Sequence, residues 1–89
     1  MTTTDARRLP VAAQVAKRSL MISGHRTSVS LEGVFWNALK EAATARSLSV
    51  ASLVAEIDAQ RGEANLSSAI RVHLFSLDRA RESLPPGRE

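Results

Sequence analysis

RTSVSLE, at residues 26–32, decides the fold, because polar and apolar side chains alternate strictly along it. Such alternation is typical of a β-strand with one buried face. The polar face of the predicted strand carries Arg26, Ser28 and Ser30. The opposite face, which carries Thr27, Val29 and Leu31, is expected to join the core.

Upstream of this stretch the sequence allows two arrangements. Leu20-Met21-Ile22 is rich in strand formers, but Gly24 separates it from the alternating run. Residues 18–22 therefore either continue the same strand after a bend or fold back through Ser23-Gly24 as a hairpin. Both arrangements stay open at this point.

After this stretch the spacing between apolar residues changes to the one typical of helices. The sequence predicts helices over residues 32–46, 50–60 and 66–81, with Ser49 and Asn65 as N-caps of the second and third. The apolar stripes that carry these predictions include Phe35, Leu39, Val50, Leu53, Val54, Ile57, Leu66, Ile70, Leu74 and Leu77. Trp36 flanks the buried face of the first helix.

The chain of 89 residues has room for one domain. We expect a flexible basic arm over residues 1–16, the folded domain over residues 17–82, and a disordered tail over residues 83–89, where Pro85-Pro86-Gly87 stops a helix. The fold class is mainly α with one N-terminal β-strand or a short hairpin.

A single strand cannot satisfy its own backbone donors and acceptors. We therefore expect an intertwined homodimer in which two copies of residues 26–32 pair as an antiparallel ribbon. Small chains are only marginally stable alone, which also favours a dimer. The expected dimer core comprises Val29, Leu31, Phe35, Trp36, Leu39, Leu53 and Ile57.

A two-stranded ribbon fits the major groove of double-stranded DNA. Arginine can bind guanine in a bidentate manner and serine can donate or accept, so Arg26, Ser28 and Ser30 are the candidate base contacts. The net charge is +3, and only one acidic residue precedes Leu31 whereas five basic residues do. That imbalance favours a polyanionic partner and makes Lys17 and Arg18 candidate phosphate contacts.

The order RTSVSLE, then Phe35-Trp36 and Leu39, then ARSLS at residues 45–49 resembles the ribbon-helix-helix superfamily of the Arc and methionine repressors. The resemblance covers about residues 17–60. It implies a homodimeric, sequence-specific repressor whose outward strand residues read bases. It also implies that the start of the second helix, at Ser49, Val50 and Ala51, clamps a phosphate.

Two features depart from the pattern of that superfamily. Ser47 stands where a glycine is usual between the two helices, so a left-handed backbone there would be strained or built differently. The third helix, over residues 66–81, exceeds the minimal fold and indicates a subgroup of compact bacterial proteins. It could cover the dimer core, join dimers into a tetramer, or bind another protein.

Other function classes lack support in the sequence. Cysteine is absent, His73 has no ligand partner at metal spacing, and no nucleophile or phosphate loop is present, so we expect no enzyme, metal or cofactor. His25 lies beside the polar strand face. No stretch is long and apolar enough for a membrane span, and we expect a cytoplasmic, nucleoid-associated protein.

The alternative function is an antitoxin-like or adaptor protein whose third helix docks a partner protein. In that case disruption of the third helix by Ile70→Asp and Leu74→Asp is expected to abolish partner binding.

Overall fold

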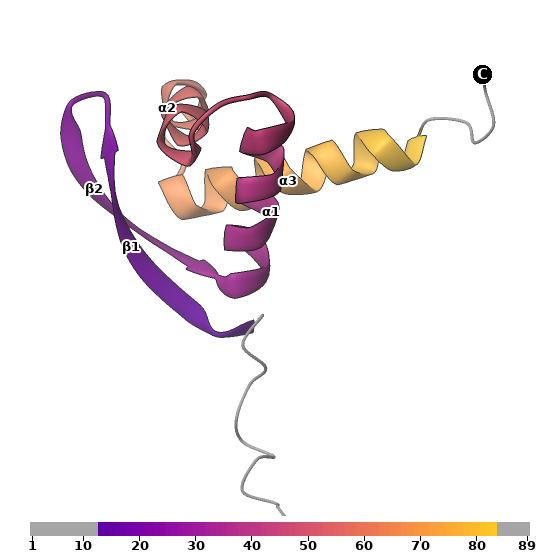
Figure 1. Cartoon of the computed structure of the whole chain (residues 1–89), viewed down its shortest axis with the longest axis horizontal. Coiled ribbons are helices and arrows are strands. Elements are labelled where there is room, and N and C mark those ends of the chain that lie inside the picture. The colour runs from indigo at the N-terminus through magenta and orange to yellow at the C-terminus, as the bar shows by residue number, and fades with distance from the viewer. Residues whose placement is uncertain (1–12, 84–89) are drawn as a thin grey trace, which may run out of the picture.

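The computed structural model describes residues 13–83, with side chains described through residue 80. Two strands are followed by three helices (Figure 1). The elements are β1 (Val15–Ile22), β2 (His25–Glu32), α1 (Gly33–Ala45), α2 (Val50–Gln60) and α3 (Leu66–Ser83).

The two strands form one antiparallel hairpin, with the register running from Ile22 opposite His25 to Val15 opposite Glu32. Ser23 and Gly24 make its two-residue turn with positive φ angles of 52° and 84°. Two positive φ angles are what a type I′ turn requires, and its twist matches that of the strands. The hairpin alternative left open by the sequence is therefore confirmed.

The hairpin also corrects the argument for strand pairing between chains. One edge of β2 is hydrogen-bonded to β1 of the same chain, so β2 is not a lone strand awaiting a partner. The sequence did not predict β1 clearly, because Arg18 places a charge on the face of β1 that turns toward the helices. Since β1 starts at Val15, the ordered domain reaches two residues into the segment expected to be a flexible arm.

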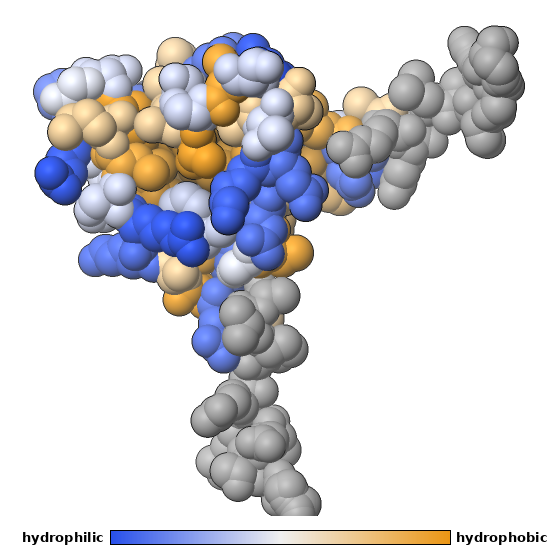
Figure 2. All heavy atoms as spheres, in the orientation of Figure 1, coloured by the Kyte–Doolittle hydropathy of each residue, from blue (hydrophilic) through white to orange (hydrophobic). Residues whose placement is uncertain are grey.

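The core lies between the inner face of the hairpin and the three helices. Ile22, Val29 and Leu31 are almost completely buried there, as the alternation of residues 26–32 predicts for the latter two. Figure 2 shows apolar side chains between the hairpin and the helices, with hydrophilic ones along the margin of the hairpin. The helices contribute Trp36, Leu39, Ala43, Leu53, Val54, Ile57, Ile70 and Leu74.

Side-chain caps start the second and third helices as predicted. The Ser52 amide donates to Ser49 Oγ over 3.0 Å, and the Ser68 amide donates to Asn65 Oδ1 over 3.0 Å. Glu32 precedes α1 without a side-chain cap, and α1 starts at Gly33, one residue later than expected.

Ser47 adopts the left-handed conformation, with φ of 57°, at the end of α1. The Leu48 amide donates to the Ala43 carbonyl over 2.8 Å, and the Ser47 amide donates to the Thr44 carbonyl over 3.0 Å. This pair of bonds is the Schellman motif, which glycine usually closes. The turn is thus built in the usual way, with serine carrying the backbone strain.

The residues predicted to form a dimer core are packed within one chain. Six of the seven are at most 4% exposed, and they are Val29, Leu31, Trp36, Leu39, Leu53 and Ile57. Contact of these residues with a second chain stays a prediction. Phe35 is the exception, since it remains partly exposed beside α3.

Candidate nucleic-acid interface

The outward face of the hairpin combines residues from both strands. Residues directly opposite each other in an antiparallel pair share a face. By this alternation Val15 and Glu32, at the open end of the hairpin, belong to the outward side, and the Glu32 carboxylate there bonds to Arg71 of α3. The rest of the outward side consists of three cross-strand pairs, which are Lys17 with Ser30, Ser19 with Ser28, and Met21 with Arg26. Five of these six side chains are exposed and Ser30 is half-buried. We call these six residues the ribbon face.

The three predicted base-contact residues, Arg26, Ser28 and Ser30, lie together on the ribbon face. Lys17, predicted to contact phosphate, joins them there. Sequence reasoning missed Ser19 and Met21. Alternation from residue 17 to 22 was the available signal, but it is blurred because Met21 places an apolar side chain on the outward face.

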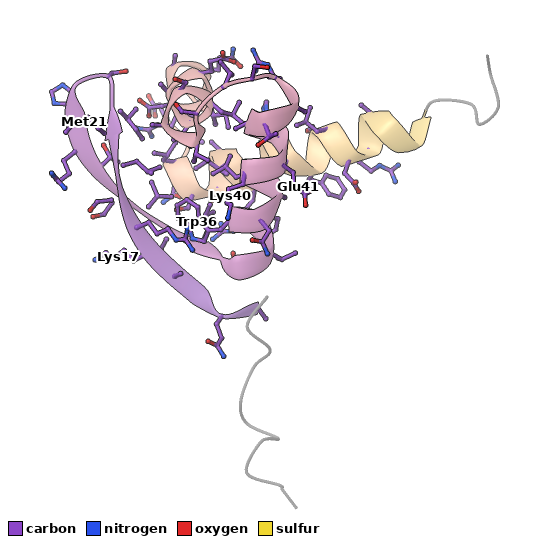
Figure 3. All side chains as sticks on the ribbon, in the orientation of Figure 1. Lys17, Met21, Trp36, Lys40 and Glu41 are labelled. Atoms are coloured by element: carbon purple, nitrogen blue, oxygen red, sulfur yellow. The ribbon has the colours of Figure 1, made fainter. Side chains whose placement is uncertain are left out.

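Lys17 and Arg26 place two cations on the ribbon face, and the acidic residue next to it on the same side of the hairpin, Glu32, is paired with Arg71. Met21 is 56% exposed and lies opposite Arg26. Figure 3 labels Lys17 and Met21 on the hairpin and Lys40 on α1, away from this face. Positive charge, hydroxyl groups and an exposed apolar side chain are together suited to phosphates, base edges and thymine methyl groups.

Arg18 lies on the opposite face of the hairpin from Lys17. Its guanidinium carbon is 4.9 Å from the centroid of the Trp36 ring, which is within the range of a cation–π interaction. The two residues predicted to contact phosphate from this segment are therefore separated: Lys17 faces outward and Arg18 stacks on α1.

Two polar contacts hold the open end of the hairpin against the helices. Trp36 Nε1 donates to the Ala16 carbonyl over 2.9 Å. Arg71 Nε donates to Glu32 Oε1 over 3.0 Å. The pKa of the Glu32 carboxyl is lowered by a hydrogen bond from its own backbone and then by Arg71. These contacts fix the hairpin to α1 and α3, so the ribbon face is presented on a rigid support.

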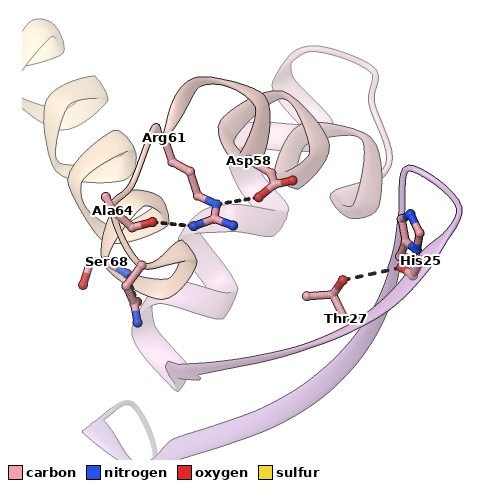
Figure 4. Close-up of polar contacts among 7 residues, drawn as sticks. His25, Thr27, Asp58, Arg61, Ala64 and Ser68 are labelled. Carbon is pink, nitrogen blue, oxygen red and sulfur yellow. Dashed lines mark hydrogen bonds and ion pairs between the residues drawn. The ribbon is translucent and has the colours of Figure 1, made fainter.

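The turn end of the hairpin carries His25 and Thr27. Thr27 is partly buried, and its hydroxyl donates a weak hydrogen bond to the His25 carbonyl over 3.5 Å (Figure 4). His25 is exposed and lies on the helix-facing side of β2, outside the ribbon face. Neither residue therefore belongs to the candidate DNA-reading surface.

Ser49, Val50 and Ala51 begin α2, in the helix layer behind the hairpin. Ser49 Oγ accepts from the Ser52 amide and donates to Ser52 Oγ over 2.9 Å. The amides of Val50 and Ala51 belong to the first turn, where no intrahelical acceptor is available.

Arg61 closes the loop between α2 and α3. It forms an ion pair with Asp58 over 2.6 Å and donates to the Ala64 carbonyl (Figure 4).

His73 lies on α3, close enough to Glu56 to help lower the pKa of that carboxyl, although Arg46 lowers it more. Within residues 13–83, no three side chains of the metal-binding types are grouped as a site, and no helix is long and apolar enough to cross a membrane.

Comparison with known proteins assigns the chain to a family. The model of the ribbon-helix-helix domain matches residues 15–77, which include the hairpin and most of α3. The chain belongs to the ribbon-helix-helix family. Members of this family are DNA-binding regulators, and the resemblance seen in the sequence is confirmed.

A solved structure shares this ribbon-helix-helix fold. It is that of an uncharacterized protein from Bordetella pertussis Tohama I, which is similar with a TM-score of 0.70 and 29% identity. The match covers 98% of this ribbon-helix-helix chain and 78% of that protein. Among proteins with curated descriptions, none matches.

Proposed function

We propose that this ribbon-helix-helix protein is a sequence-specific, double-stranded DNA-binding repressor that acts as a homodimer, with the hairpin of each chain entering the major groove. The observation that carries the proposal is the ribbon face, which is mostly exposed and cationic, while the neighbouring Glu32 is neutralised by its ion pair with Arg71. A two-stranded ribbon has the width that the groove admits.

Within the ribbon face we assign base reading to Arg26 and Ser28. Ser30 lies closer to the helices, and we assign Lys17 to a phosphate contact. Arg26 is exposed near the turn end, whereas Ser30 is half-buried near the helices. Arg26 therefore has the reach for a bidentate contact with guanine.

Two further predicted phosphate contacts lie outside the ribbon face. Ser49, Val50 and Ala51 would hold a flanking phosphate through backbone amides at the start of α2. Arg18 contributes less, because it stacks on Trp36.

Fluorescence anisotropy tests the proposal directly. The full chain is titrated with duplex from its own promoter region and with random duplex, at several salt concentrations. Arg26→Ala should weaken promoter binding by about 1–3 kcal/mol and relax base preference at one position per half-site. The Arg26→Ala, Ser28→Ala double variant should bind both duplexes equally.

Lys40→Ala is the matched control, since it also removes one exposed cation but lies on α1, away from the ribbon face. It should retain promoter preference. Absence of binding to either duplex at low salt, by a chain with a folded circular dichroism spectrum, would contradict the proposal.

The second candidate function is an antitoxin-like or adaptor role for α3. Ile70 is fully buried and Leu74 is 7% exposed, so both belong to the core and neither is available to a partner protein. The face that α3 leaves open instead includes Val72 and Phe75, each 63% exposed.

A further inference from the structure

Met21 is an apolar side chain on an otherwise polar surface, the ribbon face. It lies on β1 near the turn of the hairpin and is 56% exposed (Figure 3). The other five residues of the ribbon face are one lysine, one arginine and three serines. The exposed part of Met21 does not stabilise the fold, because the hydrophobic effect acts on surface that is removed from water. A ligand of the ribbon face would cover it.

The other large apolar side chains that the described residues expose lie away from Met21. Four of them line an open groove of about 750 Å³ between α1 and α3, and they are Val34, Val72, Phe75 and Leu77. The hairpin contributes no residue to this groove. Val15 lies at the open end of the hairpin. Met21 is therefore not part of a larger apolar patch, and its role follows from the polar residues around it.

The register of the hairpin places Met21 directly opposite Arg26 on the ribbon face. In an antiparallel pair, the Cβ atoms of directly opposed residues are about 4.5–5.5 Å apart. Successive base pairs of B-DNA are about 3.4 Å apart along the helix axis. With the ribbon in the major groove, two long side chains at that separation therefore reach neighbouring base pairs.

Met21 and Arg26 match different features of the base edges in the major groove. Arginine binds O6 and N7 of guanine, whereas the 5-methyl group of thymine offers an apolar contact. The thioether of methionine has no hydrogen-bond donor and is only a weak acceptor, so it gains little from polar base edges. Its unbranched, polarizable side chain adapts well to irregular apolar surfaces. The thymine methyl group is thus the base feature that suits Met21.

We propose that Met21 is a specificity-determining residue, which contacts the 5-methyl group of a thymine in a base pair adjacent to the guanine bound by Arg26. The inference rests on the proposed function and adds to it a T·A pair beside a G·C pair in each half-site. It also gives β1 a part in base reading. The contact uses side chains only, and it leaves the free edge of β2 open to pairing with a second chain.

Replacement of thymine by uracil tests this contact, because deoxyuridine lacks only the 5-methyl group and still pairs with adenine. The full chain is used to select bound duplexes from a library with a random core. Each thymine of a selected duplex is then replaced in turn by deoxyuridine, and binding is measured by fluorescence anisotropy. One thymine per half-site, beside the guanine, should be sensitive. Its replacement should weaken binding by about 4-fold, the contribution of one buried CH₂-sized group.

Three variants show whether Met21 makes the contact. Met21→Ala should bind the thymine and uracil duplexes equally, whereas Met21→Leu, which keeps an apolar side chain of similar volume, should retain most of the preference. Val15→Ala is the matched control, since it also truncates an exposed apolar residue of β1 but lies outside the ribbon face. It should retain the full preference. Both positions are exposed, so none of these variants disturbs the core.

Two outcomes would overturn the proposal. One is equal binding of thymine and uracil duplexes by wild type at every position, and the other is a thymine preference that persists in Met21→Ala. Either result, together with relaxed guanine preference in Arg26→Ala, would leave the proposed function intact. Absence of binding to any duplex of the library at low salt would instead contradict the proposed function, and this inference with it.

Discussion

The indole of Trp36 donates its hydrogen bond to the backbone carbonyl of Ala16, with Nε1 and O 2.9 Å apart. Trp36 is on α1 and is 2% exposed, whereas Ala16 is on β1 at the open end of the hairpin. The bond therefore ties the first strand to the first helix across 20 residues of sequence. It explains how β1, an edge strand, is held against the domain.

Trp36→Phe should retain most of the buried ring but lose this hydrogen bond. The Ala16 carbonyl would be left partly buried without its donor, so we expect destabilisation of about 1–3 kcal/mol in urea unfolding. Amide hydrogen exchange should rise in β1 more than in α2. Uniform exchange across both elements would show that the bond has no special role in holding β1.

Ser47→Gly should stabilise the protein. The left-handed backbone costs serine roughly 1–2 kcal/mol, while glycine loses about 0.5–1 kcal/mol through the entropy of the unfolded chain. The net gain should be about 0.5–1 kcal/mol, measured by urea unfolding. Ser47→Val is the opposing variant and should destabilise, because a β-branched residue resists positive φ.

Gly24→Ala should destabilise the hairpin through its backbone alone, by about 1 kcal/mol, since φ is 84° and no atom lies within 4 Å of the added Cβ. Gly62→Ala is a matched control, with φ of 61° and equally open space, in the loop before α3. Both variants should lose similar stability in thermal unfolding. Only Gly24→Ala should also weaken DNA binding, because its turn orients the ribbon face.

Lys17→Ala tests the assignment of Lys17 to a phosphate. The slope of log affinity against log salt should fall by about 1, with similar losses for promoter and random duplex. An unchanged slope with altered base preference would reassign Lys17 to base reading. Arg18→Ala is the comparison, because Arg18 stacks on Trp36 and its loss should change the slope less.

Acid should weaken two ion pairs of the domain. The pKa values of Glu32 and Glu56 are lowered from the ordinary 4.5, chiefly by a backbone hydrogen bond and by Arg46, respectively. A carboxyl whose pKa is lower in the folded than in the unfolded protein stabilises the fold fully at pH values above the unfolded pKa. That stabilisation is lost as the pH falls through the folded pKa. Urea unfolding from about pH 6 to about pH 3 should therefore show a shallower decline for Glu32→Gln, Glu56→Gln than for wild type. Parallel curves would contradict this.

The succession of β2 and the three helices, and the inward face of β2, could be predicted from periodicity alone. The same holds for the caps at Ser49 and Asn65, because a hydroxyl or amide before an apolar helix acts locally. The candidate base contacts Arg26 and Ser28 followed from strict alternation. Such features depend on neighbours within a few residues, which the sequence displays directly.

The partner of β2 could not be predicted in this way. Whether residues 15–22 pair back through Ser23-Gly24 depends on the fit of Ile22 into the core and of Arg18 on Trp36, which are contacts made at long range. For the same reason the sequence did not show that Ile70 and Leu74 are buried in one core with Val29, Leu31 and Trp36.

The sequence by itself determined the two periodicities, the caps, and the polar face of residues 26–32, because each arises from local chemistry. Only the tertiary structure decided that β1 completes the ribbon, that Lys17 faces outward while Arg18 stacks inward, and that α1 and α3 leave a groove. Helices bury whichever apolar stripe their neighbours can cover, and α3 turns Ile70 and Leu74 into the core while Val72 and Phe75 lie on its uncovered side. Val72 and Phe75 are therefore left exposed for a reason that no local pattern contains.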